Sequence, residues 1–262
     1  MASIAPNNLP ILYNDLVPLN RNQHGNFKIR KIDGLERLAT VHAVPLTIDE
    51  FAMAQRHFPI VFSAADNALP IALMGLHEGT NTFFTEEGRV RDANLYVPAY
   101  LRRFPFLLAR LSEESDELSL CFDPTADVIG EDVEGEPLFD GDEPSEATKA
   151  VLQFCEQFEQ AANRTQAFMG ELAASNLLME GEVAIQPEGV DQPFIYRGFK
   201  MVDEEKLHNL RGDELRKLNQ NGMLPLIMAH LFSLSVIREV FGRQVMQGTG
   251  PVAAPQPVPA EA

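Results

Sequence analysis

The order of apolar patterns along this chain limits its fold more than any other feature of the sequence. Before residue 125, short apolar runs are separated by turn residues, as in residues 59–62, 70–76 and 118–122, and such runs indicate strands. After residue 144, apolar residues recur every three or four positions, which indicates amphipathic helices. Strands followed by helices predict the α+β class, with a mostly antiparallel sheet in the N-terminal half packed by helices from the C-terminal half.

Finer patterns place individual elements in the N-terminal half. Residues 27–32 alternate apolar and basic side chains, and an Asp-Gly turn leads into residues 38–44, so both stretches are expected to be strands. Thr47 and Glu50 form a capping-box pattern that opens a short helix. Residues 82–90 are expected to form a hairpin with a glycine at its tight position.

The C-terminal half begins with the clearest helix in the chain. Ser145 is its expected N-cap, and an apolar stripe runs along it from Val151 to Leu172. Residues 183–185 and 194–202 then read as two strands with a Pro/Gly turn between them.

Three further helices are expected to close the fold. Asp203 and Asp213 are the expected caps of two short helices, and residues 223–241 form an apolar helix. Residues 1–246 are therefore expected to be a single domain. The remaining residues, 247–262, are rich in proline and alanine and are expected to be a disordered tail.

Charge is concentrated in one part of the chain. Residues 111–148 hold 14 Asp and Glu and no Lys or Arg, and the whole chain carries a net charge of −17. Such a surface repels phosphate groups, so neither nucleic acid nor an anionic membrane is an expected partner. Residues 123–144, called the acidic segment below, have few apolar anchors and are expected to form a long surface loop. It does not match the order of an EF-hand, and it suits a basic partner protein.

The apolar runs, the N-terminus and the cysteines indicate where in the cell the protein is expected. The longest apolar run, residues 223–237, has 15 residues with polar interruptions, whereas a membrane span needs about 20. It is therefore interpreted as a core helix. The N-terminus lacks the basic and apolar regions of a secretory signal, so a cytoplasmic location is expected. Cys121 and Cys155 are then expected to be buried free thiols, although their number also permits a disulfide.

Short catalytic motifs are missing from the sequence. There is no Walker loop, dinucleotide fingerprint, nucleophile elbow, H-E-x-x-H or C-x-x-C, and the six histidines include no pair at metal-ligand spacing. No metal site and no cofactor are therefore expected, and His57, His77 and His230 are interpreted as structural. The enzyme classes that such motifs define therefore lose support, and the sequence leans away from an enzyme without deciding the question.

The best candidate site is residues 96–106, Tyr-Val-Pro-Ala-Tyr-Leu-Arg-Arg-Phe-Pro-Phe. Its two prolines restrict the backbone, and either a short helix or a bent strand fits the pattern. Tyr96, Tyr100, Arg102 and Arg103 are candidate ligand- or partner-binding residues, because guanidinium groups bind carboxylates and phosphates and stack on aromatic rings. The alternative is that the arginines pair with the acidic segment while the aromatic rings fill the core.

Five sequence blocks, taken in order, resemble the SapC family of bacterial proteins. The blocks are residues 59–62 (PIVF), 70–75 (PIALMG), 96–106, 135–140 (GEPLFD) and 229–234 (AHLFSL). The resemblance extends from about Leu16 to Arg238. It implies a soluble accessory or binding protein that supports a pathway shared with tryptophan-halogenase-like proteins. The alternatives are a surface-layer-associated structural protein and a cofactor-independent enzyme that uses the Tyr/Arg block.

Overall fold

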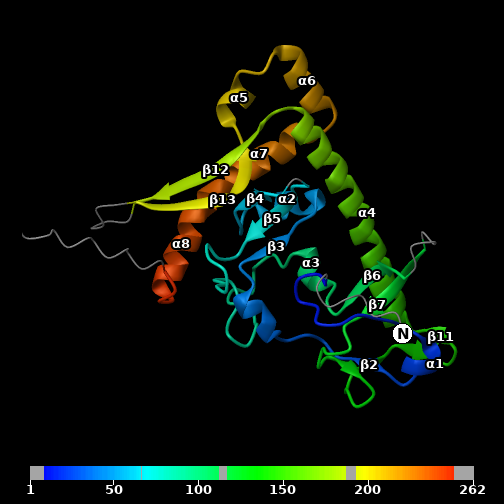
Figure 1. Cartoon of the computed structure of the whole chain (residues 1–262). Coiled ribbons are helices and arrows are strands. Elements are labelled where there is room, and N and C mark those ends of the chain that lie inside the picture. Colours follow the sequence, from blue (N-terminus) through cyan, green and yellow to red (C-terminus); the bar gives the residue numbers. More distant parts are fainter. Residues whose placement is uncertain (1–8, 66, 112–116, 187–192, 251–262) are drawn as a thin grey trace, which may run out of the picture.

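The computed structural model describes residues 9–65, 67–111, 117–186 and 193–250. Its centre is a five-stranded antiparallel sheet (Figure 1). In sheet order the strands are β12 (Leu178–Ile185), β13 (Phe194–Val202), β4 (Ile60–Ser63), β5 (Pro70–Leu73) and β3 (Ala43–Pro45). The predicted α+β class is confirmed, and the central sheet takes two of its strands from the C-terminal half. Most of the predicted tail, residues 251–262, lies outside the described residues.

The hairpin of β12 and β13 extends beyond the other strands of the sheet (Figure 1). Its register shifts between Gly181 and Val183. A Cβ at Gly181 would overlap the ring of Phe199, so glycine allows this ring to lie against the neighbouring strand. The prediction for β13 is confirmed, whereas β12 is longer than the predicted residues 183–185.

A second antiparallel sheet has the order β1 (Val17–Pro18), β7 (Leu118–Phe122) and β6 (Phe106–Arg110). Phe106 and Phe122 are paired across it and are both buried. The hydroxyl of Tyr13 donates a hydrogen bond of 2.7 Å to the carbonyl oxygen of Phe106. This bond joins the N-terminal segment to the start of β6.

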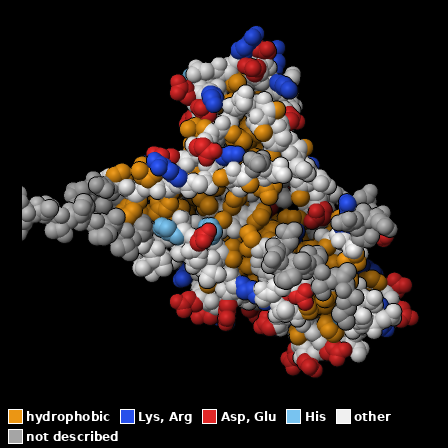
Figure 2. Space-filling model, in the orientation of Figure 1, with side chains coloured by type: hydrophobic (Ala, Val, Ile, Leu, Met, Phe, Trp, Pro, Cys, Tyr) orange, Lys and Arg blue, Asp and Glu red, His pale blue; other side chains and the backbone are white. Residues whose placement is uncertain are grey.

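The acidic segment contains more regular structure than the sequence suggests. In it, β8 (Ile129–Gly130) and β9 (Glu136–Pro137) pair with either edge of β2 (Lys28–Ile29), and β10 (Phe139–Asp140) pairs with β11 (Glu143–Pro144). Val128 and Leu138 are buried and anchor the segment to the core. The apolar residues of the segment are few, as expected, but these two are buried, so the segment is not the long irregular loop that the sequence predicted. The acids are mostly exposed, and Figure 2 shows acidic side chains along the lower part of the molecule.

Residues 38–44 are the clearest error of the strand predictions. Residues 36–40 form a 3-10 helix, η2 (Glu36–Thr40), and only the end of the predicted strand belongs to β3. The cause is the buried side chain of Asn81, whose amide donates to the carbonyl oxygens of Leu38 (2.9 Å) and Val41 (2.8 Å). These bonds satisfy carbonyl groups that a strand would have paired with a neighbour.

Helix α4 (Glu146–Ala174) runs along one side of the molecule (Figure 1). The hydroxyl of Ser145 accepts a hydrogen bond from the amide of Thr148, so the predicted N-cap is confirmed. Near the middle of α4, the hydroxyl of Thr165 accepts a hydrogen bond of 3.0 Å from the amide of Ile48. Ile48 begins η3 (Ile48–Glu50), which continues into α2 (Phe51–Ala54).

Two short helices follow the β12–β13 hairpin. Asp203 caps α5 (Glu204–His208), as predicted. The N-cap of α6 (Gly212–Gln220) is Arg211 and not Asp213, so that prediction was wrong. The carboxylate of Glu214 accepts from the amide of Arg211, and Asp213 lies inside the first turn, where its charge favours the helix dipole.

The last helical stretch is longer than the predicted 223–241. It consists of α7 (Met223–Ser233), the 3-10 turn η4 (Leu234–Val236) and α8 (Ile237–Met246). By length and composition alone, this stretch of 24 residues is long and apolar enough to cross a membrane, and 44% of its apolar window is buried inside the fold. Its buried face packs on α2, β4 and β13.

Candidate functional site

The first turn of the candidate segment is positioned by one buried carboxylate. Helix α3 (Ala99–Arg102) begins after Pro98. The amide of Ala99 (2.7 Å) and the hydroxyl of Tyr96 (3.0 Å) both donate to Oε1 of Glu50, while Thr47 donates to Oε2. Burial and the Glu50 carboxylate raise the pKa of Tyr96 to about 12. The backbone between the prolines is therefore a helix, and Glu50 fixes its position.

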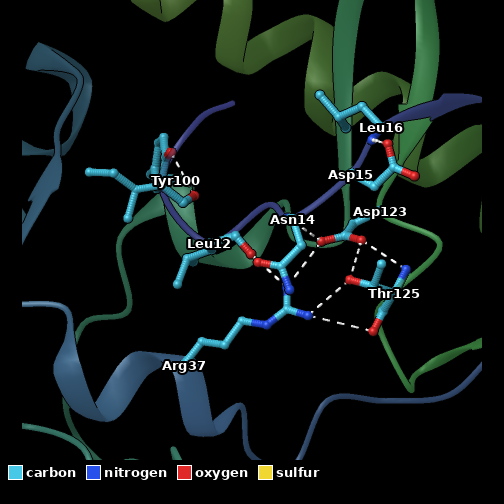
Figure 3. Close-up of polar contacts among 9 residues, drawn as sticks. Leu12, Asn14, Asp15, Leu16, Arg37, Tyr100, Asp123 and Thr125 are labelled. Carbon is cyan, nitrogen blue, oxygen red and sulfur yellow. Dashed lines mark hydrogen bonds and ion pairs between the residues drawn. The ribbon is translucent and has the colours of Figure 1, made fainter. Parts of the chain in front are cut away.

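Tyr100 lies in the core. Its side chain is buried, and its hydroxyl donates a hydrogen bond of 2.9 Å to the carbonyl oxygen of Ile11 (Figure 3). Burial raises its pKa, and the nearby guanidinium of Arg103 opposes this effect. Tyr100 therefore joins α3 to the N-terminal segment.

Arg103 is buried between aromatic rings. Its side chain is 8% exposed, and its Cζ lies 4.5 Å from the ring centroid of Tyr100 and 4.2 Å from that of Phe158. Its Nη1 lies 3.6 Å from Oε1 of Glu159 on α4, whereas its Nε has no hydrogen-bond partner in the described part of the chain. Burial raises the pKa of Glu159 above its usual value, and the guanidinium of Arg103 offsets only part of this rise. Arg103 therefore joins α3 to α4.

Arg102 points the other way and is exposed. Its Cζ lies 5.7 Å from the ring centroid of Tyr96 and 5.2 Å from that of Phe154, and its Nη2 donates to the Tyr96 hydroxyl at 3.3 Å. No carboxylate forms an ion pair with Arg102 among the described residues. The interpretation that the two arginines pair with the acidic segment was wrong. The described acids of that segment with an arginine partner are Asp123, Asp127 and Asp142, whose partners are Arg37, Arg30 and Arg21.

A cavity of about 600 Å³ lies beside α3. Its walls come from β2 and the loop after it, η2, the hairpin of residues 83–91 in which Phe84 pairs with Val90, α3 with the residues on either side of it, and the first turns of α4. The walls are mostly aliphatic and aromatic, and the side chains include Ile29, Leu35, Leu38, Phe84, Val151 and Phe154. Three charged residues also line it, namely Asp33, Arg102 and Arg103.

One wall of the cavity depends on a glycine. Gly88 has a φ of +72° at the turn of the hairpin, and a Cβ there would overlap the backbone of Leu35. The amide of Leu35 donates to the carbonyl oxygen of Gly88 at 3.3 Å. Only glycine combines this conformation with such a close approach, so the hairpin lies directly on η2.

The structure places Tyr100 and Arg102 in α3, Arg103 at its C-cap and Tyr96 just before its N-cap, but the sequence did not reveal the cavity beside them. Phe154 and Val151 belong to the apolar stripe of α4, which reads as core along its whole length. Leu35 and Leu38 lie in a stretch predicted partly as a strand. No local signal separates a residue that lines a cavity from one that fills a core.

The buried histidine of α7 has a structural role. Nε2 of His230 accepts from the amide of Val202 at 3.0 Å, so Nδ1 carries the proton and donates to the carbonyl oxygen of Ile60 at 2.7 Å. Burial lowers the pKa of His230 to about 4. Among the described residues, no group of three His, Cys, Asp or Glu side chains is arranged to hold a metal ion.

The two cysteines are free and buried, as expected. Burial raises the pKa of Cys121 and of Cys155 to about 11. Both are therefore thiols at neutral pH, and the thiol form is a weak nucleophile.

Comparisons with known proteins place the chain in a family. No curated protein and no solved structure gives a significant match. The family model named SapC matches residues 19–240, which is most of the chain and agrees with the extent of the sequence blocks. The chain therefore belongs to the SapC family.

Proposed function

We propose that this SapC-family protein is a soluble accessory protein that binds a small molecule in the cavity beside α3. The volume of about 600 Å³ is the observation that carries this proposal. Small-molecule sites usually measure about 300–1,000 Å³ and have apolar walls with a few polar groups. The cavity beside α3 has this composition.

Contacts within the protein hold the walls of the cavity in place. Glu50 fixes the start of α3, and Gly88 sets the hairpin against η2. Arg103 and Tyr100 join α3 to its neighbours. A site built in advance loses less conformational entropy when it binds.

The chemistry of the lining supports binding more than catalysis. In the described part of the cavity wall, the charged groups are two arginines and Asp33. A nucleophilic mechanism needs a nucleophile within hydrogen-bond reach of a base. The described residues of the wall supply no such pair.

The family resemblance extends this proposal to a pathway and a compartment. An accessory protein of the cytoplasm that holds a substrate or product would support enzymes of the tryptophan-halogenase-like kind. A basic partner protein is the expected protein contact, because Glu131, Asp132, Glu134 and Glu136 present charge on the surface of the acidic segment. A pull-down from the native host, read by mass spectrometry, tests the partner.

Binding at the cavity is tested by fluorescence titration with N-phenyl-1-naphthylamine, an uncharged apolar dye. We expect saturable binding by the native chain. Ala150 lines the cavity from α4, so Ala150→Trp should weaken binding by about tenfold or more, equivalent to about 1.4 kcal/mol. The control is Gln153→Trp, an exposed position on the same helix outside the cavity. The proposal fails if the dye does not bind saturably, or if both tryptophan variants bind it equally.

A further inference from the structure

We propose that the ligand of this cavity is an apolar acid, with its aliphatic or aromatic body inside the cavity and its carboxylate at Arg102. This inference rests on the proposed binding function and adds the chemical class of the ligand. It depends on the charge of Arg102, on the geometry of its side chain and on the apolar walls of the cavity.

Two acids that line a second hollow together with Arg102 are engaged by other groups. Arg102 also borders a smaller hollow of about 220 Å³, lined by Asp49 and Glu50 among others. The Glu50 carboxylate accepts from Tyr96, Ala99 and Thr47, and Asp49 pairs with Arg164. Among the described residues, no carboxylate therefore pairs with the positive charge of Arg102, in a chain whose net charge is −17.

The Arg102 side chain is held in a suitable geometry. Its guanidinium lies over the rings of Tyr96 and Phe154, which restrains it without using its hydrogen-bonding edges. One edge nitrogen donates to the Tyr96 hydroxyl, a weak contact of 3.3 Å. The remaining N–H groups form the planar fork that binds a carboxylate through two parallel hydrogen bonds.

Arg103 adds a second fixed positive charge beside the same cavity. Its nearest acid, Glu159, lies at 3.6 Å, and its Nε has no hydrogen-bond partner among the described residues. Arg103 lines the cavity, but its side chain is only 8% exposed, so we expect it to act on a bound anion mainly through its electrostatic field. Both arginines favour an anion over a neutral molecule or a cation.

The rest of the cavity selects for an apolar body. Leu35, Leu38, Phe84 and Val151 offer no hydrogen-bonding side chain, so a sugar or a nucleotide would lose hydration there without compensation. Asp33 is the acid on the wall among the described residues, and it is exposed to solvent. A molecule with a carboxylate at one end and an apolar body at the other satisfies both regions.

The class of ligand is tested by displacement of N-phenyl-1-naphthylamine at pH 7 with two matched probes, decanoate and 1-decanol. We expect decanoate to bind about tenfold more tightly than 1-decanol, as one charge-assisted contact allows. Arg102→Gln should remove this preference, and Arg102→Lys should keep part of it. Arg56→Gln removes the same charge at an exposed position outside the cavity, so it is the matched control and should keep the preference. Thermal melting checks that each variant is folded.

The outcomes separate this inference from the proposed function. If the dye and both probes bind but the acid has no advantage, or if Arg102→Gln leaves the advantage unchanged, the cavity binds small molecules and the acid assignment is overturned. If the dye itself does not bind, the binding function is overturned, and the acid assignment with it.

Discussion

Nη1 of Arg37 lies 3.0 Å from Oδ2 of Asp123, a carboxylate with no exposed surface (Figure 3). The same oxygen accepts from the amide of Asn14, and Oδ1 accepts from the amide and the hydroxyl of Thr125. The same nitrogen of Arg37 also donates to the carbonyl oxygen of Leu12. This buried carboxylate therefore joins the N-terminal segment, η2 and the start of the acidic segment.

Replacing Asp123 by Asn should destabilise the protein by roughly 3 kcal/mol, as loss of one partner of a buried pair does. Asn keeps one acceptor oxygen and turns the other into an NH₂ group, which would face the donors of Arg37 and Asn14. Urea unfolding followed by circular dichroism measures the free energy of unfolding. A loss below about 0.5 kcal/mol would contradict the role given to Asp123.

The stabilisation that Asp123 provides should depend on pH. Burial alone would raise the pKa of Asp123, but hydrogen bonds from Asn14, Thr125 and Arg37 hold it below the usual 3.8. A lowered folded-state pKa means that the stabilisation is complete above the unfolded-state pKa and is lost as the pH falls through the folded-state pKa. The difference in stability between the native chain and Asp123→Asn should therefore be constant at neutral pH and shrink below about pH 4.

The acidic segment should not bind Ca²⁺ tightly. Its acids do not follow EF-hand order, Asp123 is used inside the fold, and Asp127 pairs with Arg30 at 2.8 Å. Calorimetric titration should give no dissociation constant in the low micromolar range. The paired substitution Asp127→Asn with Glu131→Gln is the control, and a micromolar heat signal that this pair abolishes would contradict the prediction.

Local patterns predicted those elements whose structure depends on neighbours in sequence. The strands Leu118–Phe122 and Phe194–Val202 were predicted to the residue, because an apolar run with turn residues at both ends leaves few alternatives. Ser145 and Asp203 were recognised as caps for the same reason: the group that each satisfies is three residues away.

Contacts between distant residues decided the elements that sequence reasoning missed. Asn81 donates hydrogen bonds to the carbonyl oxygens of Leu38 and Val41, which lie 43 and 40 positions earlier in the chain. These bonds favour η2 over the predicted strand. Arg37 and Asp123 are 86 positions apart, and Asp123 reads in sequence as one acid among many. For the candidate site, the sequence identified residues 96–106 and their two arginines but left helix and bent strand open, and the cavity depends on which part of the α4 stripe lacks a packing partner.

The protein should be recovered in the soluble fraction after cell lysis. The helical stretch Met223–Met246 has the length and composition of a membrane span, but its polar side chains are bonded into the sheet region. Ser233 accepts from the amide of Ile60 at 2.8 Å, and Gln244 accepts from the amide of Leu76 at 2.8 Å. These partners would be lost in a bilayer. Recovery in the membrane pellet after a high-salt wash would contradict this expectation.

Tyr100→Ala should lower the free energy of unfolding by about 2–4 kcal/mol, as truncation of a buried aromatic side chain does. Tyr100→Phe keeps the ring and removes only the hydroxyl that donates to Ile11, so it should cost about 1 kcal/mol. Equal losses in the two variants, measured by urea unfolding, would mean that the ring does not contribute to the packing between α3 and its neighbours.

Adjacent arginines with different surroundings give the sharpest comparison in the molecule. Arg103→Ala should destabilise by roughly 2–4 kcal/mol, because it removes a desolvated contact with Tyr100 and Phe158 and leaves Glu159 without its partner. Arg103→Met retains much of the apolar stem and should lose less.

Arg102→Ala should change stability by no more than about 0.5 kcal/mol, because the side chain is exposed and pairs with no carboxylate among the described residues. It should nevertheless weaken decanoate binding by about tenfold, since the substitution removes the guanidinium group that we propose binds the carboxylate. Unfolding curves and dye displacement on the same protein samples separate the two effects. If both alanine variants leave melting and binding unchanged, α3 is only a connector between β-strands, and the assignment of Tyr96, Tyr100, Arg102 and Arg103 to a site fails.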